Sequence, residues 1–205
     1  MPAIIPIPGW QDAIAIVSPL GFTYRKSRMA QDSDTISMQM RGGLRRLAKA
    51  VVVITTKKDG QRHAMAATAV SELSMDPPSL LICVNQSASL HPILESGADF
   101  CINILDAAHV HISAACSGKV KGEARFEIGS WADSSIDIPR LEDAQASFVC
   151  RQTKQVPYGS HSIFIGDVVE VFSSEAVDPL VYVDGRYTRV GEDVAARCVC
   201  ISPGP

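Results

Sequence analysis

Short apolar segments separated by turn residues make up most of the chain between residues 51 and 190. The segments are rich in β-branched and aromatic residues, and Gly, Pro, Asn or Asp stands between most of them. This pattern is typical of antiparallel strands. The strands that it predicts are 51–56, 63–74, 80–84, 100–105, 147–153, 161–173 and a closing pair, "PLVYV" and "RYTRV". We therefore predict a mainly β domain, an antiparallel barrel and not a doubly wound parallel sheet.

Helical spacing of apolar residues is confined to a few segments. The longest covers residues 35–50 and precedes the first strand. Ser89 is expected to be the N-cap of a short helix over 89–97, and Asp106 the N-cap of a helix over 106–116. Residues 117–145 are polar and are expected to include a long loop. The helices are thus predicted to be peripheral to the barrel.

The chain divides into an N-terminal extension (1–34), one domain (35–191) and a C-terminal tail (192–205). Three prolines interrupt the apolar start of the extension, and its positive charges follow that start, which is unlike a signal peptide. No stretch approaches the ~20 apolar residues of a membrane span. Three of the six cysteines, Cys83, Cys101 and Cys150, lie in apolar segments, which indicates reduced thiols. We expect a cytoplasmic protein that does not bind membranes.

The composition and the motifs exclude several classes of function. The net charge is −3, from 19 basic and 22 acidic side chains, which argues against nucleic acid as the main partner. The chain contains no phosphate-binding glycine motif, no H-E-x-x-H and no G-x-S-x-G. His109 and His111 are two residues apart, so on a helix they point in opposite directions and do not form a metal site. A hydrolase would lack its nucleophile, and no metal ligands are predicted.

The segment "NQSASLHPIL" (85–94) carries the strongest candidate chemistry. The hydroxyls of Ser87 and Ser89, together with free amides at the start of a helix, are groups that bind a phosphate. On the residues alone an alternative stays open, in which Ser89 only caps the helix and Asn85 makes a turn.

A longer segment, "HAMAATAVSELSMDPPSLLICVNQSASLHPIL", resembles the flavin-binding core of the flavin reductase-like domain family. This family includes the NAD(P)H:flavin reductase components of two-component monooxygenases. The segments "FCINIL", "RFEIGSW", "PRLEDAQASFVC", "GSHSIFIGDVVEV" and "PLVYVDGRY" follow in the family's order, so that the resemblance covers residues 40 to 190. It differs from many relatives at Ala64, Ala66 and Ala69, where they carry glycine or hydroxyl residues.

The resemblance implies a Greek-key split β-barrel that forms a homodimer with FMN, or FAD, near the subunit interface. The main chain of residues 65–68 would follow the isoalloxazine edge, the loop after residue 84 would hold the ribityl and phosphate groups, and the next strand would line the flavin. Arg125 would neutralise the phosphate charge beside Phe126. The cofactor-binding residues that it implies are Met65, Ala66, Ala67, Thr68, Asn85, Ser87, Ser89, Phe100, Cys101, Ile102, Asn103, Arg125 and Phe126.

The function implied is NAD(P)H-dependent flavin reduction, in which hydride passes from the nicotinamide to flavin N5 and reduced flavin reaches a partner monooxygenase. NADH is the expected reductant. His161 is the catalytic candidate beside the nicotinamide, with Gly185, Arg186 and Tyr187 near the same cleft; the alternative for His161 is a solvent-exposed strand end. Two other functions remain open: a corrin reductase with a corrinoid acceptor, and a flavin- or haem-binding barrel without turnover.

Overall fold

The computed structural model describes residues 34–191 and divides the chain into two units, Met1–Arg46 and Leu47–Pro205. In the first unit, residues 34–44 form a helix whose apolar residues Ile36, Met40 and Leu44 are exposed. The helix predicted over 35–50 therefore ends six residues early. Apart from residue 34, the predicted extension and tail lie outside the described residues. Among residues 34–191, no helix is both long enough and apolar enough to cross a membrane.

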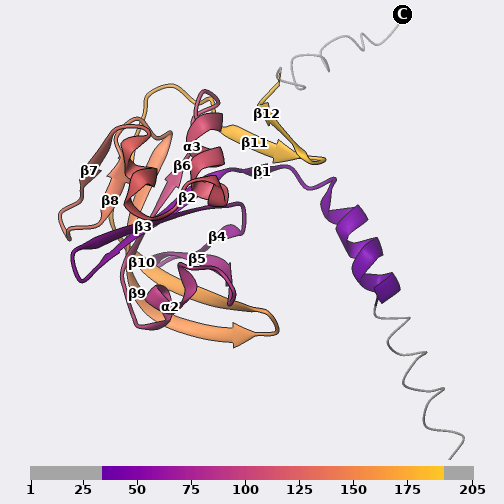
Figure 1. Cartoon of the computed structure of the whole chain (residues 1–205), viewed down its shortest axis with the longest axis horizontal. Helices are drawn as coiled ribbons and strands as arrows, with labels where there is room; N and C mark the ends of the chain where they lie inside the picture. Colours follow the sequence, from indigo (N-terminus) through magenta and orange to yellow (C-terminus); the bar gives the residue numbers. More distant parts are fainter. Residues whose placement is uncertain (1–33, 192–205) are drawn as a thin grey trace, which may run out of the picture. The chain divides into compact units, whose positions relative to one another are not determined.

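A seven-stranded antiparallel sheet forms the second unit (Figure 1). Its strands are β2 (Val52–Lys58), β3 (Gln61–Ala67), β4 (Val70–Met75), β5 (Pro78–Asn85), β6 (Phe100–Ile104), β9 (Ala146–Tyr158) and β10 (His161–Ser173). The strands lie in the order β3-β2-β6-β9-β10-β5-β4 across the sheet. Strands β3 and β4, which follow each other in the sequence, therefore stand at opposite edges. Because only Thr68 and Ala69 join them, the sheet must curl until its edges meet. The predicted mainly β barrel is confirmed.

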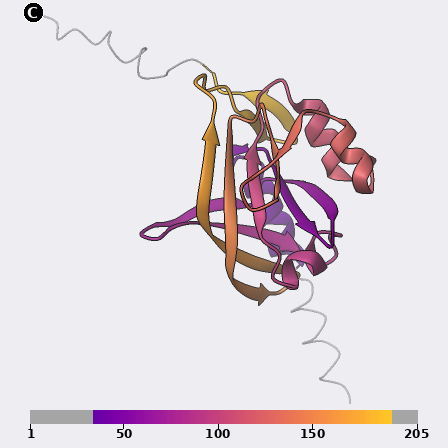
Figure 2. The same cartoon turned by 90° about the vertical axis from the view of Figure 1, so that its left-hand side faces the viewer.

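Smaller elements surround this barrel (Figure 2). They are β1 (Lys49–Ala50), β11 (Leu180–Val183) and β12 (Arg186–Arg189), the pair β7 (Trp131–Asp133) and β8 (Pro139–Leu141), and the helices α2 (His91–Glu95), α3 (Val110–Ala114), η2 (Ala115–Lys119) and η3 (Gly122–Glu127). Residues 117–145 are thus not one long loop, because four short elements occupy much of them. The helices are peripheral, as predicted.

The turns explain where several strands begin and end. Asp59 and Gly60, with φ of 51° and 75°, make the two-residue turn between β2 and β3 that "KKDGQ" predicts. The single strand predicted over 63–74 is two strands, separated by Thr68 and Ala69. Pro78 is the first residue of β5, a strand position where a missing N–H is tolerated.

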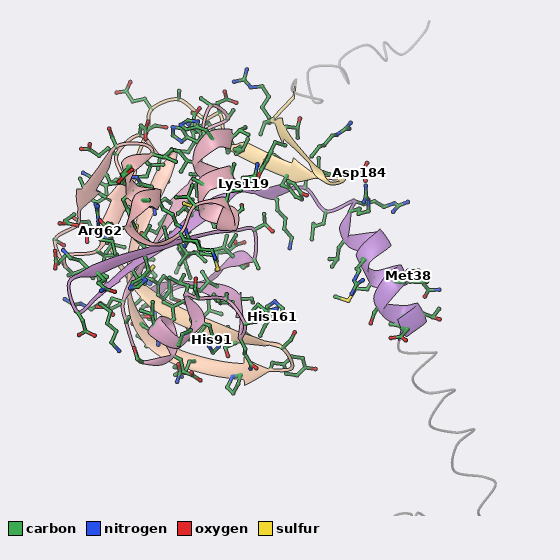
Figure 3. All side chains as sticks on the ribbon, in the orientation of Figure 1. Met38, Arg62, His91, Lys119, His161 and Asp184 are labelled. Carbon is green, nitrogen blue, oxygen red and sulfur yellow. The ribbon has the colours of Figure 1, made fainter. Side chains whose placement is uncertain are left out.

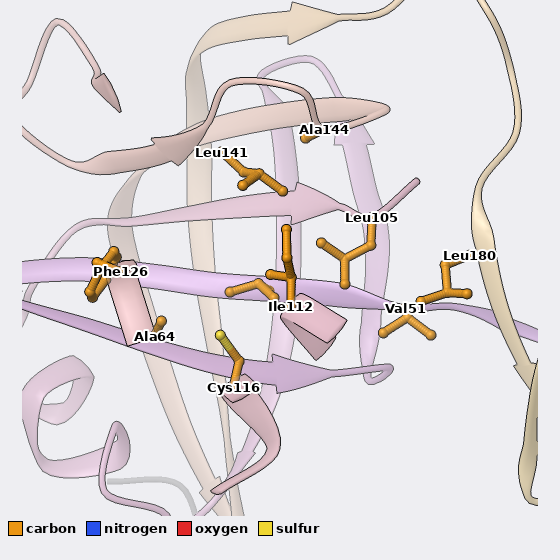
Figure 4. Packing of buried hydrophobic residues seen from close by; sticks show 10 residues of the cluster. Val51, Ala64, Leu105, Ile112, Cys116, Phe126, Leu141, Ala144 and Leu180 are labelled. Carbon is orange, nitrogen blue, oxygen red and sulfur yellow. The ribbon is translucent and has the colours of Figure 1, made fainter. Parts of the chain in front are cut away.

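Both faces of β2 are buried, which accounts for the unbroken run "VVVI". Val52 and Ile54 belong to one apolar cluster with Phe100 and Phe164. Val51 and Val53 belong to a second cluster, between the sheet and the peripheral helices, with Ala64, Leu105, Ile112, Cys116, Phe126, Leu141, Ala144 and Leu180 (Figure 4). A strand between two cores has no solvent-facing side, so its sequence does not alternate.

Two predicted helix caps are wrong. The N-cap of α2 is Leu90, without a capping side chain, so Ser89 stands outside the helix. The N-cap of α3 is His109. The Asp106 carboxylate instead accepts hydrogen bonds from the Ala108 N–H (2.9 Å) and the Gln145 side-chain amide (2.6 Å). Asp106 therefore shapes the turn before α3 and does not cap it.

Candidate active site

A pocket of about 280 Å³ opens where β3 ends. One wall consists of Ala66, Ala67 and Thr68, three residues that the sequence predicts as cofactor-binding. Their side chains are small, so a ligand in the pocket can approach the main chain closely. Since β3 is an edge strand, the sheet leaves backbone groups along one side of it unpaired. The adjacent Met65 packs its side chain against the barrel core and does not line the pocket.

The rest of the pocket comes from segments far away in the sequence. Val51, Ser113, Ser117, Tyr182 and Tyr187 complete its lining. The hydroxyls of Ser113 and Tyr187 are 2.9 Å apart, and the rings of Tyr182 and Tyr187 meet edge to face at 5.4 Å. The sequence places Tyr187 near a cleft but misses the other four, which are common residue types without a local motif.

The predicted phosphate loop follows β5, a strand that contacts the bend next to the pocket wall. The Ala69 carbonyl accepts a hydrogen bond from the Cys83 N–H (2.9 Å), which fixes the β3–β4 bend beside the last residues of β5. At the end of β5, Asn85 pairs with His161 on β10, and the Gln86 N–H donates to the Ser160 carbonyl (2.9 Å). The bend after the pocket wall therefore contacts β5, and the end of β5 carries the loop and pairs with His161.

Within the loop, Asn85 uses one of its two hydrogen-bonding groups locally. Its side-chain oxygen accepts from both the N–H and the hydroxyl of Ser87, at 2.8 Å each. The Ser87 hydroxyl is thus already engaged, contrary to the expectation that both serines face a phosphate. Ser89 is exposed, and its hydroxyl makes no hydrogen bond to any residue that the structure describes. The loop therefore offers a ligand Ser89 and the Asn85 amide N–H groups.

His161 is exposed, at the start of β10 (Figure 3). Its Nδ1 lies 2.9 Å from the Ser160 hydroxyl, which orients the ring and leaves Nε2 without a hydrogen bond among the described residues. His91 lies nearby but is buried, with Nε2 2.8 Å from the Ser162 hydroxyl and its ring against Phe164. We therefore assign His91 to the scaffold and keep His161 as the ligand-facing candidate.

Most of the described residues are similar in sequence to known proteins. Residues 44–191 match the model of the flavin reductase-like domain. The chain belongs to this family. It is 39% identical to the reductase component of the FADH(2)-dependent resorcinol hydroxylase of Rhizobium sp. (strain MTP-10005), over 74% of this chain and 86% of that one.

Further relatives agree with this assignment. The flavin reductase-like domain is 38% identical to the FMN reductase (NADH) RutF of Agrobacterium fabrum (strain C58), over 74% of this chain and 87% of that one. Among solved structures it is similar to BorF, the flavin reductase component of a bacterial two-component tryptophan halogenase. That match has a TM-score of 0.70 and 28% identity, and it covers 76% of this chain and 99% of the other.

The four β6 residues implied by the resemblance do not reach the pocket of this flavin reductase-like domain. Phe100, Cys101, Ile102 and Asn103 are all buried, because β6 lies between β2 and β9 in the middle of the sheet. The Asn103 amide donates to the Val53 carbonyl (3.0 Å), and its oxygen accepts from the Leu141 N–H (2.8 Å) and the Ser147 hydroxyl (2.9 Å). Its polar groups are used inside the core, so we leave all four out of the proposed site.

Arg125 and Phe126 also have a structural role that the sequence does not predict. Arg125 donates to the Val120 carbonyl (2.8 Å) and to the Ala64 carbonyl, so its guanidinium links η3 to β3. Phe126 is buried in the core, and the Arg62 guanidinium lies over its ring at 4.4 Å. These contacts hold η2, which carries Ser117, against β3. Arg125 therefore positions the two walls of the pocket, and backbone carbonyls engage two of its three guanidinium nitrogens.

The cysteine behind the pocket is not a nucleophile. Cys116 is buried beside Ser117, and this burial raises the pKa of its thiol to about 11, although nearby Arg125 lowers it slightly. At neutral pH the thiol is therefore protonated and unreactive. The four cysteines within residues 34–191 are free thiols. Within the same range, no cluster of His, Cys, Asp or Glu is suited to a metal ion.

Proposed function

We propose that this chain is an NADH-dependent flavin reductase that reduces FMN and supplies reduced flavin to a partner monooxygenase. One observation carries the proposal: a pocket is walled by the small residues Ala66–Thr68, and the bend that follows them contacts β5, whose end carries a hydroxyl-bearing loop and pairs with an exposed histidine. The named relatives, reductase components and an NADH-dependent FMN reductase, support this assignment.

The residues present suit a flavin mononucleotide. A flat ring requires small side chains on one wall, which Ala66 and Ala67 provide, and aromatic surface nearby, which Tyr182 and Tyr187 provide. A phosphate requires hydrogen-bond donors, and Ser89 and the Asn85 amide are free to donate at the loop. We propose FMN over FAD because we assign binding groups to the ring and the first phosphate only.

When bound, a flavin accepts hydride at N5 from the dihydronicotinamide, so the chain itself need not supply a base. Its task is to hold the two rings in register and to exclude competing reactions. We assign His161 to the nicotinamide nucleotide, because the Ser160 contact leaves its Nε2 available. A neutral imidazole there can hydrogen-bond a carboxamide or a pyrophosphate group.

We also propose that the chain is a cytoplasmic homodimer, with NADH drawn from the cytoplasmic pool. Apolar side chains are exposed on β4 (Leu73, Met75) and on β10 (Val169, Val171), and Met75 is 84% exposed. The pairings Met75↔Pro78 and Asp167↔Ser79 place these strand segments on either side of the first residues of β5. A second copy would remove this apolar surface from water.

Light scattering should show a dimer, and dissociation of the dimer should release flavin. A monomer with full activity would contradict this proposal.

The test of the main proposal is the absorbance of the purified protein with FMN, before and after anaerobic addition of NADH. Bleaching of the flavin bands, with saturable consumption of free FMN in steady-state assays, is the expected result. Bound flavin without bleaching would instead indicate a barrel that binds flavin without turnover. Flavin that bleaches but stays bound through gel filtration would indicate transfer to another acceptor.

A further inference from the structure

A single hydrogen bond ties the β11–β12 hairpin to α3 across the wall of the pocket. It joins the hydroxyls of Tyr187 and Ser113, 2.9 Å apart. Ser113 is almost completely buried, with 1% of its surface exposed, whereas Tyr187 is 37% exposed and lines the pocket. The neighbouring ring of Tyr182 packs edge to face against Tyr187, so the tyrosine ring is held on two sides.

The surroundings of Ser113 decide which hydroxyl donates. Its N–H donates to the His109 carbonyl (3.0 Å), and its own carbonyl accepts from the Ser117 hydroxyl (2.7 Å). Within residues 34–191, the only partner of the Ser113 hydroxyl is Tyr187. If Tyr187 donated, the Ser113 proton would be buried without an acceptor, which is an unfavourable arrangement. This favours Ser113 as the donor and the Tyr187 oxygen as the acceptor.

This direction leaves the phenolic proton of Tyr187 without a protein acceptor among the described residues, on a side chain that lines the pocket. A hydroxyl that accepts one hydrogen bond becomes a better donor for the next, because each bond polarises its neighbour. Tyr182 differs, since its hydroxyl makes no hydrogen bond to a described residue and nothing orients it.

We propose that Tyr187 donates a hydrogen bond to an acceptor atom on the edge of the bound ring, and that Ser113 is the positioning residue that orients this donor. The inference rests on the proposed flavin reductase function and extends it to specificity. A ring with carbonyl or imine acceptors at its edge, such as the isoalloxazine of FMN, satisfies the donor. A flat aromatic ring without such an acceptor would leave it unpaired and would bind less well.

The test compares Tyr187→Phe with Tyr182→Phe, two variants that each remove one hydroxyl and keep the ring contact. Titration with FMN in the absence of NADH should show a Kd about 5-fold higher for Tyr187→Phe, as expected for one hydrogen bond, and a smaller rise for Tyr182→Phe, whose hydroxyl is not oriented. The longest-wavelength absorption band of bound FMN should shift in the first variant alone.

A double-mutant cycle tests the role of Ser113. Ser113→Ala should weaken FMN binding by about 2-fold in the wild type and should cause no further loss in the Tyr187→Phe variant, because it acts through that hydroxyl. The inference is overturned if Tyr187→Phe binds FMN as the wild type does, or if Tyr182→Phe weakens FMN binding as much as Tyr187→Phe. It is also overturned if the effects of Ser113→Ala and Tyr187→Phe on the Kd multiply in the double variant. If NADH still bleaches FMN bound to the wild type, such results would refute only the role of Tyr187 as a donor. If the wild type does not bind FMN, the proposed function is refuted as well.

Discussion

Replacing Ser89 by alanine tests whether the loop after β5 binds a phosphate. In the structure, the Ser87 hydroxyl donates a hydrogen bond to the Asn85 side-chain oxygen. The Ser89 hydroxyl is exposed and has no partner among the described residues. A hydrogen bond to a charged group contributes about 1.5–3 kcal/mol. Because Ser89 is exposed, we take the lower bound of about 1.5 kcal/mol, which corresponds to an FMN Kd roughly 10-fold higher.

The assay is calorimetric titration of each variant with FMN and with riboflavin, which has the same ring and ribityl chain but no phosphate. Ser89→Ala should weaken the binding of FMN and leave that of riboflavin unchanged. Ser87→Ala is the matched control in the same loop. The Ser87 N–H still donates to Asn85 after this substitution, so we expect about a 2-fold change at most, for both ligands alike.

Two results would refute this reasoning. Equal losses for FMN and riboflavin in Ser89→Ala would show that the hydroxyl serves the ribityl chain or the shape of the loop. Unchanged affinity for FMN in a folded Ser89→Ala variant would show that the phosphate does not bind in this loop. The proposed orientation of the whole ligand would then be wrong as well.

Three further predictions concern the histidine and the core. His161→Ala should raise the KM for NADH about 10-fold with nearly constant flavin affinity, since a contact to the bound nucleotide is made in ground and transition states alike. Gly166→Ala should lower the free energy of unfolding in urea by about 1–3 kcal/mol, because the added Cβ would lie 2.7 Å from the Cys150 Cβ and 2.8 Å from the Phe100 ring; Gly43→Ala, with nothing within 4 Å, should not. Burial raises the pKa of Cys150 from 9.0 to about 12, so the unfolded chain ionises first as pH rises. Between pH 9.0 and about 12 the free energy of unfolding should therefore fall by an extra ~1.4 kcal/mol per pH unit, and Cys150→Ala should remove this increment.

Each of these predictions has a contrary outcome. Loss of FMN with an unchanged KM for NADH would place His161 in the flavin pocket. Equal stability of the Gly166→Ala and Gly43→Ala variants would mean that the side chains of Cys150 and Phe100 can move aside at no cost. An alkaline slope that is the same in Cys150→Ala and the wild type would assign the pH dependence to other groups.

Local patterns predict the strands of this protein well, because each strand carries its own β-branched or aromatic residues and its own turn residues. The prediction fails where a distant segment decides the outcome. Apolar spacing continues from the helix of residues 34–44 to Leu47, but Lys49 and Ala50 pair with β11, more than a hundred residues later. The bend at Thr68 and Ala69 is likewise absent from the local pattern, because the closure of the barrel imposes it.

The site shows the same division between local and distant information. The family resemblance implies that Ala66–Thr68, one contiguous segment, bind the cofactor, and in the structure these residues line the pocket. The resemblance also implies that Arg125 binds a phosphate, whereas in the structure this side chain donates hydrogen bonds to two backbone carbonyls. Ser113, Ser117 and Tyr182 escape prediction because hydroxyls and aromatic rings are common, and only the fold brings them together.

Ser89 and Tyr187 represent the two ends of the proposed site, and their effects should be independent. Tyr187 is bonded to Ser113 on α3 and contacts Tyr182, whereas Ser89 stands in the loop before α2, and the two share no partner. Substitutions without shared partners have additive free energies. The Ser89→Ala/Tyr187→Phe double variant should therefore raise the FMN Kd about 50-fold, the product of roughly 10-fold and 5-fold. A loss well below this product would mean that FMN shifts in the pocket once either contact is removed, so that the phosphate loop and the ring wall are alternative anchors and not simultaneous ones.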